Sequence, residues 1–358
     1  MSKRSSITVA AIAAAAALLL AACSSSSSSS SAAATTPAKA TRVCVILPDS
    51  ASSPRYEQGD RPALQAAITA AGFTADIQNA QGDTAKFGTI ADQQLAGGCG
   101  VMILDDLQGA GIQVAVKARA QGVPVIAYDR PLAGAAYYVS FDNVKVGGLE
   151  GQMIVDGLKA AHKDAKTASV VYVGGDPADG NAKMFRDGAI AVMSAAGIKP
   201  AGETVGVWDG AKATTYFEQV FTKLKGKVDA VWVANDTNAA GVITVLDHNS
   251  MKVPVSGQDA SLAGLQNVLL GKQFGTVYKP FQLEADAASK IAIAILKGET
   301  PTVNSKLADG TPFEALTPIS VSAATVKDVV SSGAAGVPTA ADICTAPVAA
   351  ACTKYGVK

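Results

Sequence analysis

The sequence predicts an α/β fold of two doubly wound parallel-sheet lobes, and two observations lead to this prediction. From residue 42 onward, short runs of β-branched and other apolar residues alternate with longer, alanine-rich amphipathic segments. Strands that alternate with helices of ten or more residues form βαβ units on a parallel sheet. The runs are apolar along their whole length, which is typical of a sheet covered by helices on both faces.

Each half of the chain supplies a similar set of elements. The expected strands are 43–47, 73–77, 101–104, 123–128, 169–173, 204–207, 228–234 and 253–256. The expected helices are 61–71, 112–120, 146–159, 182–196, 214–223 and 239–249.

Polar residues follow three of the expected strands in each half, among them Asp129-Arg130 in the first and Asn235-Asp236 in the second. In an open α/β sheet the ligand site lies at the carboxyl ends of the strands. We therefore expect two similar lobes that face one ligand. The alternative is that these Asp and Asn residues cap the helices that follow.

The N-terminal segment indicates export. Lys3 and Arg4 precede an apolar stretch at 7–20, and small residues then lead to Cys23. This pattern describes a signal peptide at 1–22, and the stretch is short for a membrane span. The segment Leu20-Ala-Ala-Cys23 resembles the lipobox of bacterial lipoproteins, in which the cysteine is acylated. We therefore expect an exported protein anchored to the outer face of the cell membrane, and the alternative is a secreted protein that loses Cys23.

A low-complexity segment follows Cys23, the expected site of the lipid anchor. Eight serines occupy 24–31, and Ala, Thr and Pro residues continue to residue 40. Such a segment has nothing to bury, so we expect 23–41 to be a flexible tether. The chain carries 30 Lys and Arg and 30 Asp and Glu, a formal net charge of zero, which disfavours a nucleic-acid partner.

Four further cysteines predict two disulfides in an exported chain. Cys344 and Cys352 are close in sequence, which leaves Cys44 to pair with Cys99. In a sheet of order 2-1-3-4-5 the strands beside these two cysteines are neighbours that start at the same edge, which brings them within bridging distance. The alternative is buried free thiols. The cysteines lack Cys-x-x-Cys spacing, so we expect no metal site and no cofactor.

Six short motifs occur in a fixed order along the chain. They are Ala127-Tyr-Asp-Arg130, Val139-Ser-Phe-Asp-Asn143, Asn181-Ala-Lys-Met-Phe-Arg186, Ala234-Asn-Asp236, Ser256-Gly-Gln-Asp259 and Thr276-Val-Tyr-Lys-Pro280. With these motifs the chain, from about residue 42 to 321, resembles the periplasmic sugar-binding proteins of the ribose/xylose type, and most of all the xylose-binding proteins.

The resemblance implies the type I periplasmic binding protein fold and assigns the sugar contacts. These fall on Arg55, Tyr56, Asp129, Arg130, Asn181, Arg186, Trp208, Asn235, Asp259 and Lys279. Such side chains suit a sugar, since acids and amides accept from hydroxyls, bases donate to them, and aromatic rings cover the C–H faces.

The resemblance also implies the domain plan. The N-terminal lobe is 42–142 plus about 282–313, the C-terminal lobe is 143–281 plus about 314–326, and 327–358 form a C-terminal extension. The chain crosses between lobes near 141–144, 276–281 and 314–318, and these three crossings form a hinge. The implied function is capture of a monosaccharide, with D-xylose or a related sugar expected, and its delivery by a monomer to an ABC transporter permease.

The sequence bears on three other functions. A glycoside-processing enzyme would need a catalytic constellation, and no G-x-S-x-G, Walker or H-E-x-x-H motif occurs in the sequence. A sugar-responsive repressor would need an N-terminal helix-turn-helix, where this chain has the expected export signal. A sensor that presents its sugar to a membrane receptor remains an alternative to transport.

Overall fold

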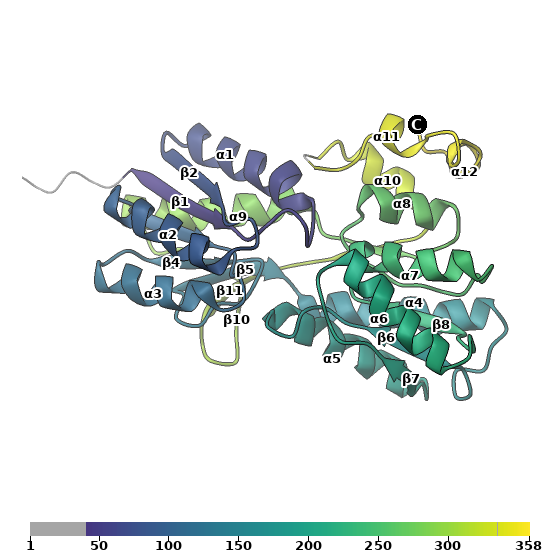
Figure 1. Cartoon of the computed structure of the whole chain (residues 1–358). Coiled ribbons are helices and arrows are strands. Elements are labelled where there is room, and N and C mark those ends of the chain that lie inside the picture. The colour runs from purple at the N-terminus through teal and green to yellow at the C-terminus, as the bar shows by residue number, and fades with distance from the viewer. Residues whose placement is uncertain (1–40, 335) are drawn as a thin grey trace, which may run out of the picture. The chain divides into compact units, whose positions relative to one another are not determined.

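The computed structural model describes residues 41–334 and 336–358 (Figure 1). The expected signal peptide, Cys23 and the tether up to residue 40 lie outside the described residues.

The first sheet has seven strands in the order β10-β11-β5-β4-β3-β1-β2. All neighbouring pairs are parallel except β10 with β11, and the portion β2-β1-β3-β4-β5 has the order expected from the sequence. The strands are β1 (Arg42–Leu47), β2 (Thr74–Asn79), β3 (Val101–Leu104), β4 (Val125–Tyr128), β5 (Tyr137–Phe141), β10 (Ser305–Lys306) and β11 (Pro312–Leu316).

Helices cover both faces of this sheet, which explains its apolar strands. Along β1, Val43, Val45 and Leu47 face one cluster of buried residues while Cys44 and Ile46 face another, as the two-residue period of a strand requires. The first cluster includes side chains of α1 (Arg61–Ala70) and α9 (Phe281–Lys297), and the second those of α2 (Thr84–Ala96) and α3 (Ala110–Ala120).

The second sheet contains three parallel strands in the order β7-β6-β8. Single bridges, Val231 to Val255 and Gln258 to Val277, continue it to the antiparallel pair β9-β12. The strands are β6 (Val170–Val173), β7 (Pro200–Glu203), β8 (Ala230–Val233), β9 (Thr276–Tyr278) and β12 (Ile319–Val321). Buried clusters on its two faces include α4 (Asn143–Ala160) with α5 (Gly180–Ala195), and α6 (Gly210–Lys223) with α7 (Asp236–His248).

Two strand predictions are wrong. The strand expected at 253–256 is only a single bridge, in which Val255 pairs with Val231 of β8. The strand expected at 204–207 lies four residues earlier, at β7, where Gly202 pairs with Val171 of β6. Val220 packs over Gly202 in the space that a Cβ would occupy. The apolar Val205 that suggested a strand is 68% exposed, so its segment has left the sheet.

The chain passes between the two sheets three times. It leaves the first sheet after β5, returns between β9 and α9, and leaves again between β11 and β12. The fold class predicted from the sequence, with two doubly wound units and three connections, is confirmed.

The C-terminal segment packs on the second half of the chain. Its helices α10 (Val326–Ser331), α11 (Ala340–Ile343) and α12 (Ala349–Tyr355) share one buried cluster with α8 (Leu262–Leu269), β9 and β12. A disulfide between Cys344 and Cys352 ties α11 to α12.

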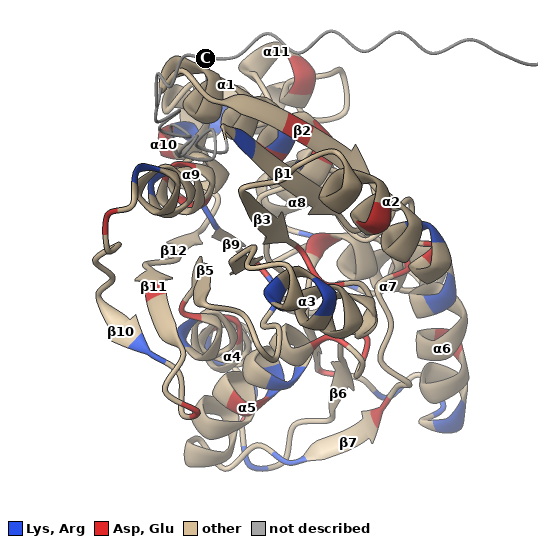
Figure 2. Cartoon of the chain, turned by 90° about the vertical axis from the view of Figure 1, so that its left-hand side faces the viewer, with Lys and Arg blue, Asp and Glu red and all other residues tan. Residues whose placement is uncertain are grey.

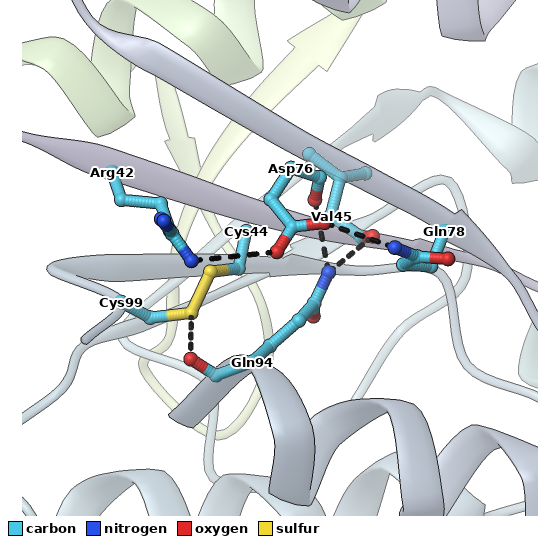
Figure 3. The surroundings of a disulfide bond; sticks show 7 residues. All are labelled: Arg42, Cys44, Val45, Asp76, Gln78, Gln94 and Cys99. Atoms are coloured by element: carbon cyan, nitrogen blue, oxygen red, sulfur yellow. Dashed lines mark hydrogen bonds and ion pairs between the residues drawn. A yellow bond between two sulfur atoms is a disulfide. The ribbon is translucent and has the colours of Figure 1, made fainter. Parts of the chain in front are cut away.

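A second disulfide joins Cys44 of β1 to Cys99, with the two Cα atoms 5.8 Å apart (Figure 3). In the ladder Cys44 lies opposite Met102 of β3, so Cys99 belongs to the turn before that strand. Gly98 adopts a φ of 86° in this turn, a conformation that glycine tolerates. The pairing is the one expected from the sequence, although the cysteines are not opposite each other in the ladder.

Candidate functional site

The loops after the strands of both sheets meet around one cavity. We call it the inner cavity. Its lining comes from the loops after β1, β4, β6, β7, β8 and β9, and from the segment at 256–259. The lining residues are Ser52, Ser53, Arg55, Tyr56, Asp129, Arg130, Asp179, Asn181, Phe185, Trp208, Asn235, Gln258, Asp259 and Lys279.

The structure brings together every predicted sugar contact except Arg186. That side chain projects from α5 toward the end of β7, where its guanidinium donates to Glu203 at 2.7 and 2.9 Å. It is 42% exposed and does not line the inner cavity. In the structure an exposed ion pair with Glu203 holds Arg186 on the surface, apart from the other predicted contacts.

Arg55 is a buried cation held from behind by carboxylates. Its Nε and Nη2 donate to Asp60 at 2.9 and 2.8 Å, and Nη2 also donates to Glu284 of α9 at 2.6 Å. Although burial opposes the charge, Asp60 and Glu284 raise the pKa of Arg55 well above its ordinary value. The remaining nitrogen, Nη1, lies 3.5 Å from Oδ1 of Asp129 in the cavity wall.

Asp129 is an ionised carboxylate at a strained backbone position. Tyr56 donates its hydroxyl to Oδ2 at 2.8 Å. Burial alone would raise the pKa of Asp129, but Arg55 and Lys279 outweigh burial and lower it. Its φ is 56°, and Asp259 on the opposite side of the cavity has a φ of 96°. Such values are rare for residues other than glycine, and they concentrate at functional sites.

The second carboxylate, Asp259, pairs with the buried Lys279, whose Nζ lies 3.0 Å from Oδ1. Burial lowers the pKa of Lys279, but Asp259 and Asp129 outweigh it and raise the pKa above its ordinary value. The ammonium also lies over the ring of Phe185, 5.6 Å from its centroid.

Hydrogen bonds at the cavity join the two halves of the chain directly. Asn181 of α5 donates through Nδ2 to the backbone oxygen of Asp129 at 3.0 Å. Asn235 donates through Nδ2 to the backbone oxygen of Ser52 at 3.3 Å, while its Oδ1 caps α7 through the backbone N–H of Asn238. Asn235 thus combines the helix-capping role with a place in the cavity.

Arg130 contacts residues of both halves of the chain. Its Nε lies 3.2 Å from Asp179, and Nη2 donates to the hydroxyls of Ser52 and Tyr56 at 3.3 Å. Burial lowers the pKa of Arg130, but Tyr56, Asp179 and further carboxylates outweigh it and raise the pKa well above its ordinary value.

Several buried atoms of the cavity wall make no hydrogen bond within the described residues. They include donors and acceptors: Ser53 Oγ, Arg55 Nη1, Asp129 Oδ1, Arg130 Nε, Gln258 Oε1 and Asp259 Oδ1. Four of these atoms lie in ion pairs within the wall, whereas Ser53 Oγ and Gln258 Oε1 have no partner there. Leaving such a buried polar atom unpaired costs about 1–3 kcal/mol. The wall carries three basic and three acidic side chains, so its formal charges cancel. The inner cavity therefore suits a neutral ligand whose groups both donate and accept.

Sequence reasoning missed Ser52, Ser53, Asp179, Phe185 and Gln258 of the cavity wall. Asp179 lies two residues before the selected Asn181, and its position at the N-terminus of a helix was a usable signal. Glu284, which holds Arg55 from behind, is 229 residues away in the chain, and no local pattern links the two.

Within residues 41–334 and 336–358, no three His, Cys, Asp or Glu side chains are grouped so that they could hold a metal ion. None of the helices described there has the length and hydropathy needed to cross a membrane.

The fold and the site define the class of protein. A family model for the periplasmic binding protein domain matches residues 43–300, well over half of the chain. The chain therefore belongs to the periplasmic binding protein family, whose members are non-enzymatic components of transport systems.

Individual relatives of the chain are named for the sugar that they bind. The chain is 33% identical over 286 residues to the D-xylose-binding periplasmic protein of Escherichia coli (strain K12), covering 76% of this chain and 84% of that protein. The D-xylose-binding periplasmic protein of Haemophilus influenzae is 34% identical over 286 residues, and the match covers 76% of this chain and 84% of that protein. Among solved structures, an ABC transporter solute-binding protein from Clostridium phytofermentans with bound β-D-glucose superposes with a TM-score of 0.76. It is 26% identical, and the match covers 84% of this chain and 99% of that one.

Proposed function

We propose that this protein captures a neutral monosaccharide, D-xylose or a closely related sugar, in the inner cavity and delivers it to an ABC transporter. The observation that carries the proposal is the set of buried donors and acceptors that make no hydrogen bond within the described residues, in a wall whose formal charges cancel. A sugar ring supplies hydroxyl groups that donate and accept at once. An anionic sugar phosphate would place its charge beside Asp129, Asp179 and Asp259.

The aromatic lining of the cavity supports a sugar ring as the ligand. Tyr56, Phe185 and Trp208 supply apolar faces for the C–H groups of a sugar. The relatives support the same class, since two are named as D-xylose-binding proteins and a structural neighbour holds β-D-glucose.

We further propose that the two halves act as lobes that close on the sugar. The N-terminal lobe would comprise 42–142 with about 282–313, and the C-terminal lobe 143–281 with about 314–326. The bonds of Asn181 to the Asp129 backbone and of Asn235 to the Ser52 backbone support closure, because each joins one lobe to the other. Since one chain supplies the whole cavity wall, we propose that the protein acts as a monomer.

The route to the membrane is also a proposal. Cleavage after residue 22 and acylation of Cys23 would anchor the chain outside the cell, with 23–41 as the tether. Mass spectrometry of the mature N-terminus tests this, and replacing Cys23 by Ala should release the protein from the membrane fraction. Membrane-bound protein in the Ala variant would contradict the anchor.

Transport is favoured here over sensing, although one relative at 29% identity, from Rhizobium radiobacter, is named as a multiple sugar-binding receptor. Uptake of labelled sugar by cells that lack this protein separates the two roles. Loss of uptake supports transport, and unchanged uptake contradicts it.

Titration calorimetry with pentoses, hexoses and polyols tests the ligand class. We expect at least one neutral monosaccharide to bind in the sub-millimolar range. Replacing Arg130 by Ala should weaken binding by about 2–5 kcal/mol, because it leaves buried partners unpaired. Replacing Arg119, an exposed arginine that donates to the Gly134 backbone, is the matched control and should leave affinity unchanged. If no sugar of the panel binds, the proposal is wrong.

A further inference from the structure

Asp179, which the sequence analysis did not select, lies where two cavities adjoin. Beside the inner cavity lies an outer cavity with an empty volume of about 1120 Å³, lined by polar loops of both halves. Ser52, Arg130, Asp179 and Trp208 line both cavities. These four residues therefore form the partition between the inner and the outer cavity.

The two carboxylate oxygens of Asp179 have different partners. Oδ1 accepts the backbone N–H of Asn181 at 2.9 Å and so caps α5. Oδ2 accepts from Trp208 Nε1 at 2.9 Å and lies 3.2 Å from Arg130 Nε. Arg130 follows β4 of the first sheet, whereas Trp208 follows β7 of the second. A single oxygen therefore holds together two side chains from opposite halves of the chain.

The backbone and a neighbouring ring fix the orientation of Trp208. A Cβ on Gly175 would lie 2.1 Å from two carbon atoms of the indole, so the ring packs directly against the backbone of that glycine. The ring of Phe185 meets the indole edge-on, with centroids 6.4 Å apart. With Asp179 bonded to its nitrogen, the indole is held on three sides.

We propose that Asp179 is a positioning residue that holds Trp208 and Arg130 as this partition and thereby restricts the site to a ligand with one sugar ring. The proposal rests on the proposed function, because it requires a sugar in the inner cavity. A second ring linked to the first would extend into the outer cavity, through the space that the indole and the guanidinium occupy. Loss of the Oδ2 contacts frees both groups, which weakens their contacts with a single ring and opens the way to a longer ligand.

Two variants disturb the partition by different routes. Asp179→Asn is nearly isosteric and keeps the Oδ1 cap of α5, but it replaces Oδ2 with an amide NH2 group that can neither accept from Trp208 nor pair with the Arg130 guanidinium. Gly175→Ala leaves Asp179 intact and displaces the indole. Asp176→Asn is the matched control: this carboxylate lines the outer cavity alone, and the amide can still accept from the backbone of Ala178.

Titration calorimetry with D-xylose and xylobiose, and with D-glucose and cellobiose, measures the effect. We expect the wild type and Asp176→Asn to prefer the monosaccharide strongly. Asp179→Asn should bind the monosaccharide about 10–100-fold more weakly, as for a lost charge-assisted hydrogen bond. Its preference over the disaccharide should fall as well, and Gly175→Ala should show the same fall in preference.

A double-mutant cycle distinguishes positioning from a general structural effect. In a Trp208→Phe background, which lacks the indole N–H, Asp179→Asn should weaken binding much less than in the wild type. If Asp179→Asn keeps wild-type affinity and preference, or if its effect adds fully to that of Trp208→Phe, the positioning proposal is overturned while sugar binding stands. If the wild type binds none of the four sugars at sub-millimolar affinity, the proposed function is overturned with it.

Discussion

Replacing Asp259 by Asn tests the pairing of charges inside the cavity. The side chains of Asp259 and Lys279 are 10% and 6% exposed, and the variant removes the carboxylate that lies 3.0 Å from the ammonium. Asn is the appropriate substitute because it is isosteric and tolerates a positive φ, which is 96° at this position. Any loss of stability then reports the missing charge rather than backbone strain.

The expected loss follows from burial. Removing one partner of a buried ion pair typically costs about 3–5 kcal/mol of the free energy of unfolding, since the other charge stays buried. Asp129 also attracts Lys279, so we expect a loss near the lower end, about 3 kcal/mol. The pKa of Lys279 should fall, because burial lowers this pKa and the variant removes Asp259, a carboxylate that raises it. Sugar affinity should weaken by about 1.5–3 kcal/mol, as for a hydrogen bond to a charged acceptor.

The chain offers a matched control in the exposed pair of Asp247 and Lys272, which are 2.6 Å apart and 47% and 39% exposed. Asp247→Asn should cost at most about 1 kcal/mol, since solvent screens such pairs. Urea denaturation gives the free energies of unfolding, and titration calorimetry gives the affinities. Equal effects of Asp259→Asn and Asp247→Asn on both quantities would refute the reasoning.

Three further predictions concern stability and Arg186. Burial raises the pKa of Glu150 well above its ordinary value, although the hydrogen bond from Trp232 acts in the opposite direction. The folded wild type therefore binds a proton that the unfolded chain has already released. Its stability falls as the pH rises above the pKa of Glu150 in the unfolded chain. Glu150→Gln keeps an acceptor and cannot ionise, so its free energy of unfolding relative to the wild type should rise between about pH 5 and pH 8; parallel profiles would contradict this. Replacing both Cys44 and Cys99 by Ser should cost up to about 4 kcal/mol in urea denaturation, because the bridge closes a loop of 55 residues, and an unchanged midpoint would count against that estimate. Arg186→Ala should leave sugar affinity unchanged in calorimetry, and a large loss would return this residue to the site.

The main strands could be predicted because burial on both faces leaves a strong local signal. The apolar runs of β1, β3, β4, β6 and β8 are each almost entirely buried. The signal fails at β7, where Pro200 and Gly202 occupy the strand and its residues are largely exposed. The three residues of β9 were expected only as part of a crossing, since so short a strand has no period to detect.

The cavity could be predicted in outline because its residues follow strands, and the carboxyl ends of parallel strands meet at one edge. Arg186 was assigned to the site by the resemblance rather than by a position after a strand. It lies on a helix, one residue after the cavity-lining Phe185, and a turn of about 100° per residue directs the two side chains differently. Supporting residues such as Asp60 and Glu284 were missed because only the folded chain brings them behind Arg55.

The charges of the chain outside the cavity are mixed in sign. Figure 2 shows Lys and Arg interspersed with Asp and Glu over the helices, in keeping with a formal net charge of zero. The balanced charges that matter for binding are those of the cavity wall, where each basic side chain lies beside a carboxylate. Recognition by this wall depends on local pairing rather than on a long-range field.

A crystal structure with the tightest-binding neutral sugar of the panel is the most direct test of the central claim. The account predicts one sugar ring in the inner cavity, with hydroxyl groups within hydrogen-bond distance of Arg55 Nη1, Arg130 Nε, Asp129 Oδ1 and Asp259 Oδ1, and with Arg186 still paired to Glu203. A sugar bound only in the outer cavity, beside Asp49 and Lys212, would contradict the account.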